Sequence, residues 1–172
     1  MVIYLQMIDD PRDRSKFEQL YTKYKDLMHY TAYKILRNDR DAEDAVHDAF
    51  LAIVRNIEKI SAVERPKTRA YVVTIVENKA IDLYRKRQRR PTGELTEETA
   101  GISVEYDGDN ELGRCMAKLP ARYRQFLLLR YDHDYTVKEV AQMMGLSVSA
   151  AYKLEQRAKK KLETICREAG VL

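Results

Sequence analysis

Apolar residues recur at spacings of three and four along most of this chain, and this pattern decides its fold class. From about Lys16 to Leu36 they form one stripe, which is typical of a helix with one buried face. The stripe consists of Phe17, Leu20, Tyr21, Tyr24, Leu27, Met28 and Ala32. Similar stripes predict helices over about 42–60 and 68–89, and only 6 Gly and 4 Pro occur among 172 residues. The sequence therefore predicts an all-α protein.

The chain also contains signals for where these helices begin and end. The opening "VIYLQMI" predicts a short strand that has no partner strand elsewhere. We expect Pro11 to end this strand and Ser15 to cap the helix that follows. Pro66 disfavours a helical conformation at Arg65, so "SAVERPKT" is predicted to be a loop.

A change in composition separates two helical regions. Residues 91–110 are rich in Thr, Gly, Glu and Asp, contain no Lys or Arg, and show no periodicity. We interpret this segment as a flexible acidic linker between two small domains, residues 1–90 and 111–172. The acidic residues could serve only as a tether, or they could mimic nucleic acid and shield a basic surface, and we favour the tether.

A dense basic run, "AIDLYRKRQRR", stands directly before this linker. Cations near a helix C-terminus are favourable by about 0.3–1 kcal/mol each, which accounts for one or two of them. The run contains Arg85, Lys86, Arg87, Arg89 and Arg90. Such a density favours a polyanionic partner, whose binding should weaken steeply with salt.

Within the helix predicted over 68–89, two sets of residues lie on opposite faces. The inner stripe contains Val72, Val76, Ala80, Leu83 and Tyr84, and the other face contains Tyr71, Ile75, Asn78, Asp82, Arg85 and Arg89. Helical spacing places the second set on one polar and increasingly cationic surface. Lys86, Arg87 and Arg90 point elsewhere, and we expect them to add general attraction for phosphate.

The segment "TVKEVAQMMGLSVSAAYKLEQRA" has the pattern of a helix-turn-helix. Thr136 would cap the first helix, Gly145 would end it with a positive φ, and Ser147 or Ser149 would cap the second helix. Ala141 is small enough for two helices to cross closely, and Leu146 fills the turn. The second helix would enter the DNA major groove. Its outward face would carry Ser149, Tyr152, Lys153, Gln156, Arg157 and Lys160.

Signals for catalysis and metal binding are weak. Asp44 and His47 have the i, i+3 spacing of metal sites in helical bundles, but the second copy that such a site requires is missing. Cys115 and Cys166 have neither metal-ligand spacing nor a disulfide framework, and free thiols fit a reducing cytoplasm. There is no signal peptide and no apolar run long enough to span a membrane. We therefore expect a cytoplasmic protein without cofactor, metal or enzymatic activity.

The motifs together resemble the sigma-70 family of RNA polymerase sigma factors, and within it the extracytoplasmic-function (ECF) group. "DAEDAVHDAFLAIVR" and "RAYVVTIVENKAIDLYRKRQRR" resemble region 2. "LPARYRQFLLLRYDHDYTVKEVAQMMGLSVSAAYKLEQRAKKKL" resembles region 4. The three motifs occur in the family's order, with a linker where the family has one. Tyr71 stands where the family usually has Trp, and Ala150, Ala151 and Tyr152 depart from the usual recognition helix.

The resemblance implies partners and roles. Core RNA polymerase would bind through its β′ clamp and β flap, with Asp44, Asp48 and Arg55 contacting the clamp. The loop Ser61–Thr68 would hold a base flipped from the promoter −10 element. The −10 contacts would be Lys67, Thr68, Tyr71, Asn78, Asp82, Arg85 and Arg89. At the −35 element Arg130 would grip a phosphate, and the other contacts would be Ser149, Tyr152, Lys153, Gln156 and Arg157.

The resemblance also allows an anti-sigma factor to bind between the two domains, and we expect a monomer when the protein is free. Two alternatives belong to other functional classes. The first is a stand-alone helix-turn-helix regulator, which would not bind core polymerase. The second is a helical metalloenzyme built around Asp44 and His47, which would carry stoichiometric metal.

Overall fold

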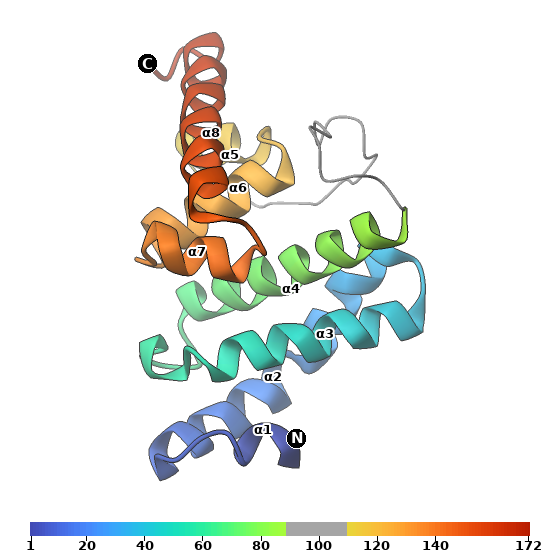
Figure 1. Cartoon of the computed structure of the whole chain (residues 1–172). Helices are drawn as coiled ribbons and strands as arrows, with labels where there is room; N and C mark the ends of the chain where they lie inside the picture. Colours follow the sequence, from blue (N-terminus) through green and yellow to red (C-terminus); the bar gives the residue numbers. More distant parts are fainter. Residues whose placement is uncertain (89–109) are drawn as a thin grey trace. The chain divides into compact units, whose positions relative to one another are not determined.

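The computed structural model describes residues 1–88 and 110–172, and every regular element in these ranges is a helix (Figure 1). This confirms the predicted fold class. Arg89, Arg90 and nearly all of the predicted linker lie outside the described residues. The chain divides into two compact units, Met1–Arg90 and Pro91–Leu172, and each is described by itself. Among the described residues, no helix combines the length and the apolar character needed to cross a membrane.

Unit 1 is built on three long helices. They are α2 (Pro11–Leu36), α3 (Asp39–Val54) and α4 (Pro66–Arg87), and each packs against the other two. A short helix α1 (Val2–Leu5) precedes them, and a 3-10 turn η1 (Ile57–Lys59) follows α3. The predicted stripes meet in the core, whose fully buried side chains include Phe17, Leu20, Met28, Phe50, Ile53, Val72 and Val76.

The opening segment was predicted as a strand, and this prediction is wrong because the segment forms α1. Tyr4 draws it into the helical core, where its ring lies 5.5 Å from that of Phe17 and 5.6 Å from that of Phe50. Ile8 is buried as well. An isolated strand would have left its backbone groups unpaired, whereas a helix pairs them locally.

The start of α2 also differs from the prediction. Pro11 is the first residue of α2 and does not end an element before it, since its fixed φ suits the first helical turn. Asp10 is the cap and accepts a hydrogen bond from the backbone N–H of Arg12 at 2.7 Å. Ser15 therefore lies inside the helix.

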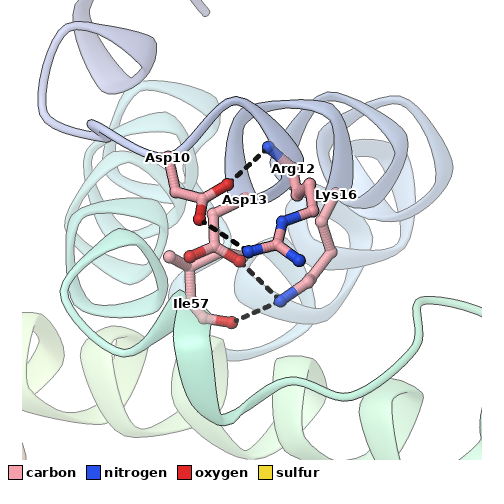
Figure 2. A network of polar contacts seen from close by, with 5 residues as sticks. All are labelled: Asp10, Arg12, Asp13, Lys16 and Ile57. Atoms are coloured by element: carbon pink, nitrogen blue, oxygen red, sulfur yellow. Dashed lines mark hydrogen bonds and ion pairs between the residues drawn. The ribbon is translucent and has the colours of Figure 1, made fainter.

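A polar network holds this first turn of α2 in place (Figure 2). Arg12 pairs with Asp10 at 3.3 Å, and Lys16 pairs with Asp13 at 2.7 Å. The Lys16 ammonium also donates to the carbonyl of Ile57 in η1, at 3.2 Å. The turn after α3 is thereby fastened to the beginning of α2.

The helices α3 and α4 begin earlier and end earlier than predicted. Asn38 caps α3, and its side chain accepts a hydrogen bond from the backbone N–H of Asp41 at 3.0 Å. α3 then stops at Val54, and η1 occupies half of the rest of the predicted helix. α4 begins at Pro66, directly after an extended Arg65, as expected for a residue before proline.

Unit 2 is a smaller helical assembly around one long helix. It comprises α5 (Glu111–Ala117), α6 (Ala121–Leu127), a π-helical turn η3 (Leu128–Asp132), α7 (Val137–Met143) and α8 (Val148–Glu168). α8 packs against α5, α6 and α7. Asn110, the last residue of the predicted linker, caps α5 by accepting from the backbone N–H of Gly113 at 2.6 Å.

Candidate nucleic-acid interface

The helix-turn-helix pattern corresponds to α7, the turn after it, and α8. Thr136 and Glu139 form a capping box, in which the Thr136 hydroxyl accepts from the Glu139 N–H at 3.2 Å and the Glu139 carboxylate accepts from the Thr136 N–H at 2.8 Å. Gly145 has φ +65°, as predicted. Ser147, rather than Ser149, caps α8 and accepts from the Ala150 N–H at 3.1 Å.

The turn places α8 with one face on unit 2 and another toward solvent. Ala141 on α7 and Ala151 and Ala158 on α8 are buried, which fits closely packed helices. The predicted outward residues are all exposed, and Tyr152 retains 53% of its surface. They are Ser149, Tyr152, Lys153, Gln156, Arg157 and Lys160. The exposed face of α8 is therefore the one that the periodicity indicates.

Arg130 lies in η3, and the sequence did not predict its two partners, of which only Glu155 belongs to α8. Its Nη1 donates to the carbonyl of Tyr135 at 3.2 Å, and its Nε lies 3.9 Å from Glu155 Oε1. Lys159 also pairs with Glu155, at 3.6 Å. The Glu155–Lys159 pair could have been found from its i, i+4 spacing. The link to Arg130 exists only in the folded unit.

On α4 the predicted DNA-contacting face is largely buried, which corrects the exposed surface inferred from the sequence. Tyr71 retains 4% of its surface and Asn78 retains 0%, and Thr68 is buried too. Asp82 and Arg85 are half-buried, and Lys67 is exposed. Tyr71, Ile75 and Asn78, which make up the middle of this face, are themselves uncharged. Burial of the Asn78 amide costs little free energy provided that the amide is hydrogen-bonded.

The loop before α4 is held by hydrogen bonds from both sides. Thr68 donates its hydroxyl to the carbonyl of Ala62 at 2.6 Å, and Arg65 donates to the hydroxyl of Ser61 at 3.0 Å. From α2, Tyr24 donates to the carbonyl of Val63 at 2.8 Å. These contacts give the segment 61–68 a defined conformation.

The basic C-terminal end of α4 contains one residue, Arg87, with a partner that the sequence did not predict. Arg87 forms an ion pair with Asp41 in the first turn of α3. The Asp41 side chain is only 6% exposed, so its carboxylate requires a partner. Arg87 therefore connects α4 to α3, while its side chain stays 51% exposed. Lys86 is exposed as well, and the attraction of phosphate by these two residues stays a prediction.

The predicted polymerase-binding residues lie on α3. Asp44 and Asp48 are exposed, as is Arg55 at the end of the helix. Their spacings of four and seven place them on one side of the helix.

His47, which lies between Asp44 and Asp48 in the sequence, forms a 2.6 Å hydrogen bond through Nδ1 with the hydroxyl of Tyr4. Burial, followed by Tyr21 and Asp48, raises the pKa of Tyr4, so this phenol stays protonated.

The pair Asp44 and His47 does not gain further metal ligands from the fold. Within residues 1–88 and 110–172, no three side chains of His, Cys, Asp or Glu gather so that they could hold a metal ion. The alternative of a metalloenzyme centred on this pair therefore has no additional ligand to build on in the described part of the chain.

Comparison with known proteins gives the same family for both units. Residues 20–90 match the family model described as Sigma-70 region 2, and residues 109–162 match Sigma-70, region 4. The ECF RNA polymerase sigma factor SigW of Bacillus subtilis is 24% identical, over 91% of each chain. The RNA polymerase sigma factor SigV of the same species is 26% identical over 72% of this chain and 75% of SigV.

Among solved structures, the chain is similar to the sigma factor RpoE from Bartonella quintana, in complex with the anti-sigma factor NepR. That similarity covers 88% of this chain and 96% of RpoE, with 16% identity and a TM-score of 0.41. The two region models cover both helical units in the order that the sequence motifs predict. The chain therefore belongs to the sigma-70 family, in the ECF group of RNA polymerase sigma factors that direct promoter-specific transcription initiation.

Proposed function

We propose that this sigma factor reads the promoter −35 element with the outward face of α8. The observation that carries the proposal is the solvent-exposed polar face of a helix that begins directly after a well-capped helix-turn-helix turn. Lys153, Gln156 and Arg157 offer the groups that read base edges or grip phosphates in a major groove. Arg130 would hold a backbone phosphate beside them.

The −10 element would be read by α4 and the loop before it. Opening DNA costs a few kcal/mol for each unstacked base, and stacking on an aromatic ring returns about 1–3 kcal/mol. In this proposal Tyr71 supplies the ring, and Lys67, Asp82, Arg85 and Arg89 line the strand. Because Thr68, Tyr71 and Asn78 are buried, these side chains must become exposed before they contact DNA.

Core RNA polymerase would bind unit 1 through Asp44, Asp48 and Arg55, and the β flap would bind unit 2. The polymerase would supply all the chemistry, so the sigma factor needs no catalytic residue of its own. It would act in the cytoplasm as a monomer until it binds polymerase. An anti-sigma factor, such as the one seen with RpoE of Bartonella quintana, is a further proposed partner.

Transcription with purified core polymerase tests the proposal. The protein is expected to direct transcripts from defined start sites on DNA that includes its own upstream region, and core polymerase alone is not. Asn78→Ala is expected to impair opening of the −10 element while polymerase binding persists. Absence of any promoter-specific transcript would overturn the proposal.

Co-precipitation of core polymerase distinguishes the proposal from a stand-alone regulator. The sigma factor is expected to retain polymerase in the absence of DNA, and Asp48→Arg is expected to weaken this binding. Glu43→Arg is the matched control, because Glu43 is exposed on α3 but lies on a different side of the helix from Asp48. Equal loss in both variants would count against the proposed contact.

A further inference from the structure

Four side chains of unit 2 form one cluster beside the outward face of α8. Arg130 and Tyr131 come from η3, and Glu155 and Lys159 come from α8. Oxygen Oε1 of Glu155 accepts a hydrogen bond from the Tyr131 hydroxyl at 2.5 Å. The same oxygen lies 3.6 Å from the Lys159 ammonium and 3.9 Å from Arg130 Nε. One carboxylate therefore holds two cations and a phenol.

The ring of Tyr131 supports the same two cations. The Lys159 ammonium lies 4.8 Å from the ring centroid, and the guanidinium carbon of Arg130 lies 5.3 Å from it. Cations within about 6 Å of an aromatic centroid are attracted to the ring. Glu155 and Tyr131 thus keep two like charges side by side that would otherwise repel each other.

Both cations remain accessible to a ligand. The Lys159 side chain is 56% exposed and that of Arg130 is 35% exposed, whereas that of Glu155 is only 12% exposed. An ammonium has three donors, so Lys159 keeps donors for a further acceptor. Its hydrogen bond with Tyr131 and the nearby Glu155 raise the pKa of Lys159, so it stays charged.

The cluster is adjacent to the proposed DNA-reading face. Lys159 stands three residues after Gln156 and seven after Tyr152, so helical spacing makes these side chains neighbours on α8. Gln156 and Tyr152 belong to the exposed face. A duplex seated on that face would bring a backbone phosphate toward the flank that carries Lys159 and Arg130.

We propose that Lys159 is a second DNA-phosphate contact next to Arg130, and that Glu155 and Tyr131 are positioning residues that hold the two cations as a pair. The inference rests on the proposed −35 role of unit 2. It adds to that role a contact that carries affinity without base specificity, because a phosphate is the same at every sequence.

Salt-dependent binding of the full chain to a fluorescein-labelled duplex of random sequence tests the contact. Each phosphate contact contributes about 0.9 to the slope of log K against log salt, measured here between about 50 and 200 mM. Lys159→Ala is expected to reduce the slope by about 0.9 and to weaken binding about fivefold at about 50 mM salt. Lys159→Arg is expected to restore both.

Arg167→Ala is the matched control. Arg167 pairs with Glu163 at 2.5 Å in the same i, i+4 arrangement on α8, but no described contact places it against an aromatic ring. Its loss is expected to leave the slope unchanged. An unchanged slope in Lys159→Ala, or an equal decrease in Arg167→Ala, would overturn the inference.

The sign of a charge change tests the positioning role. Glu155→Gln removes one negative charge and so raises the net charge of the protein by one. If Glu155 merely repelled DNA, this variant would bind the duplex more tightly than wild type. We expect about threefold weaker binding, because the two cations separate once the carboxylate is lost. Glu163→Gln, the same change at the control pair, is expected to bind equally well or slightly more tightly. Tighter binding by Glu155→Gln overturns the positioning role.

Circular dichroism establishes that each variant is folded. If Glu155→Gln is not folded, Tyr131→Phe is tested in its place. Tyr131 is half-exposed, and this substitution removes only the hydroxyl that donates a hydrogen bond to Glu155. This variant is expected to weaken binding, and unchanged binding would overturn the positioning role. Failure of the −35 role itself has a different signature: promoter-specific transcription that does not change in Gln156→Ala.

Discussion

The two helices proposed to contact DNA, α4 and α8, are nearly equal in length and opposite in burial. α8 buries a narrow stripe that includes Ala151, Ala158 and Ile165, and exposes charged residues elsewhere. α4 has buried residues around most of its circumference over its first four turns. They include the polar Thr68, Thr74, Glu77 and Asn78. The same helical period therefore predicts the exposed face of α8 correctly and that of α4 wrongly.

The difference teaches that a polar residue at helical spacing does not by itself indicate a solvent-exposed face. An uncharged Thr or Asn can be buried at small cost once it is hydrogen-bonded, and α4 buries even the charged Glu77. On α4 the proposed DNA contacts also affect stability. On α8 they lie on the exposed face.

The largest effect is expected when one valine of each helix is replaced by aspartate. This pair of substitutions tests the difference in burial between α4 and α8. Val76 on α4 is fully buried, and Val148 in the first turn of α8 is 43% exposed. Val76→Asp buries an unpaired charge and is expected to lower the free energy of unfolding by about 3–5 kcal/mol. Val148→Asp should be neutral or slightly stabilising at the helix N-terminus. Urea unfolding followed by circular dichroism measures both, and similar losses would contradict the comparison.

The next largest effect is expected when the arginine near the C-terminal end of each helix is replaced by alanine. Arg87 on α4 pairs with the buried carboxylate of Asp41, and Arg167 on α8 pairs with an exposed glutamate. Arg87→Ala is expected to cost about 1–3 kcal/mol because Asp41 is left unpaired. Arg167→Ala should cost less than about 1 kcal/mol. Recovery of the Arg87→Ala loss in the double variant with Asp41→Asn would confirm that the pair is responsible.

The starts of the two helices differ as well. Ser147 caps α8 with its hydroxyl, whereas Arg65 precedes α4 without a capping side chain. Ser147→Ala is expected to lower the free energy of unfolding by about 1 kcal/mol. Ser149→Ala and Arg65→Ala should change it by less than about 0.5 kcal/mol. A larger loss in Ser149→Ala than in Ser147→Ala in thermal or urea unfolding would refute the assignment of the cap.

The smallest expected effect concerns Cys166, a buried thiol on α8. Burial raises the pKa of Cys166 above its usual value of 9.0, and a hydrogen bond with Cys115 adds to the shift. The folded protein therefore holds the thiol proton more tightly than the unfolded chain does. This contribution to stability is complete below pH 9 and is lost as the pH rises through the raised pKa. The difference in free energy of unfolding between wild type and Cys166→Ala should be smaller at alkaline pH than near neutral pH.

Much of unit 2 could be predicted from the sequence because its signals are local. The capping box at Thr136, the positive φ of Gly145 and the outward face of α8 each depend on residues within a few positions of one another. Backbone conformation and helical period determine such features directly. The order of the motifs was likewise enough to indicate the family that the comparisons show.

Other features of the candidate sites could not be predicted because they join residues far apart in the chain. Nothing near Arg87 indicates that it pairs with Asp41, and nothing near Arg130 indicates Glu155. The helical form of the opening segment depends on Tyr4 reaching Phe17 and Phe50. Propensity within that segment is a weaker influence than this packing.

The sequence alone therefore determined an all-α chain of the sigma-70 family, a helix-turn-helix with Thr136 as its first cap, and the residues that α8 exposes. Only the tertiary structure decided that Tyr71 and Asn78 are buried, that Arg87 holds α3, and that Glu155 gathers Arg130 and Lys159. The reason is physical: periodicity specifies which way a side chain points along its own helix, but burial and charge pairing depend on what other segments bring to meet it.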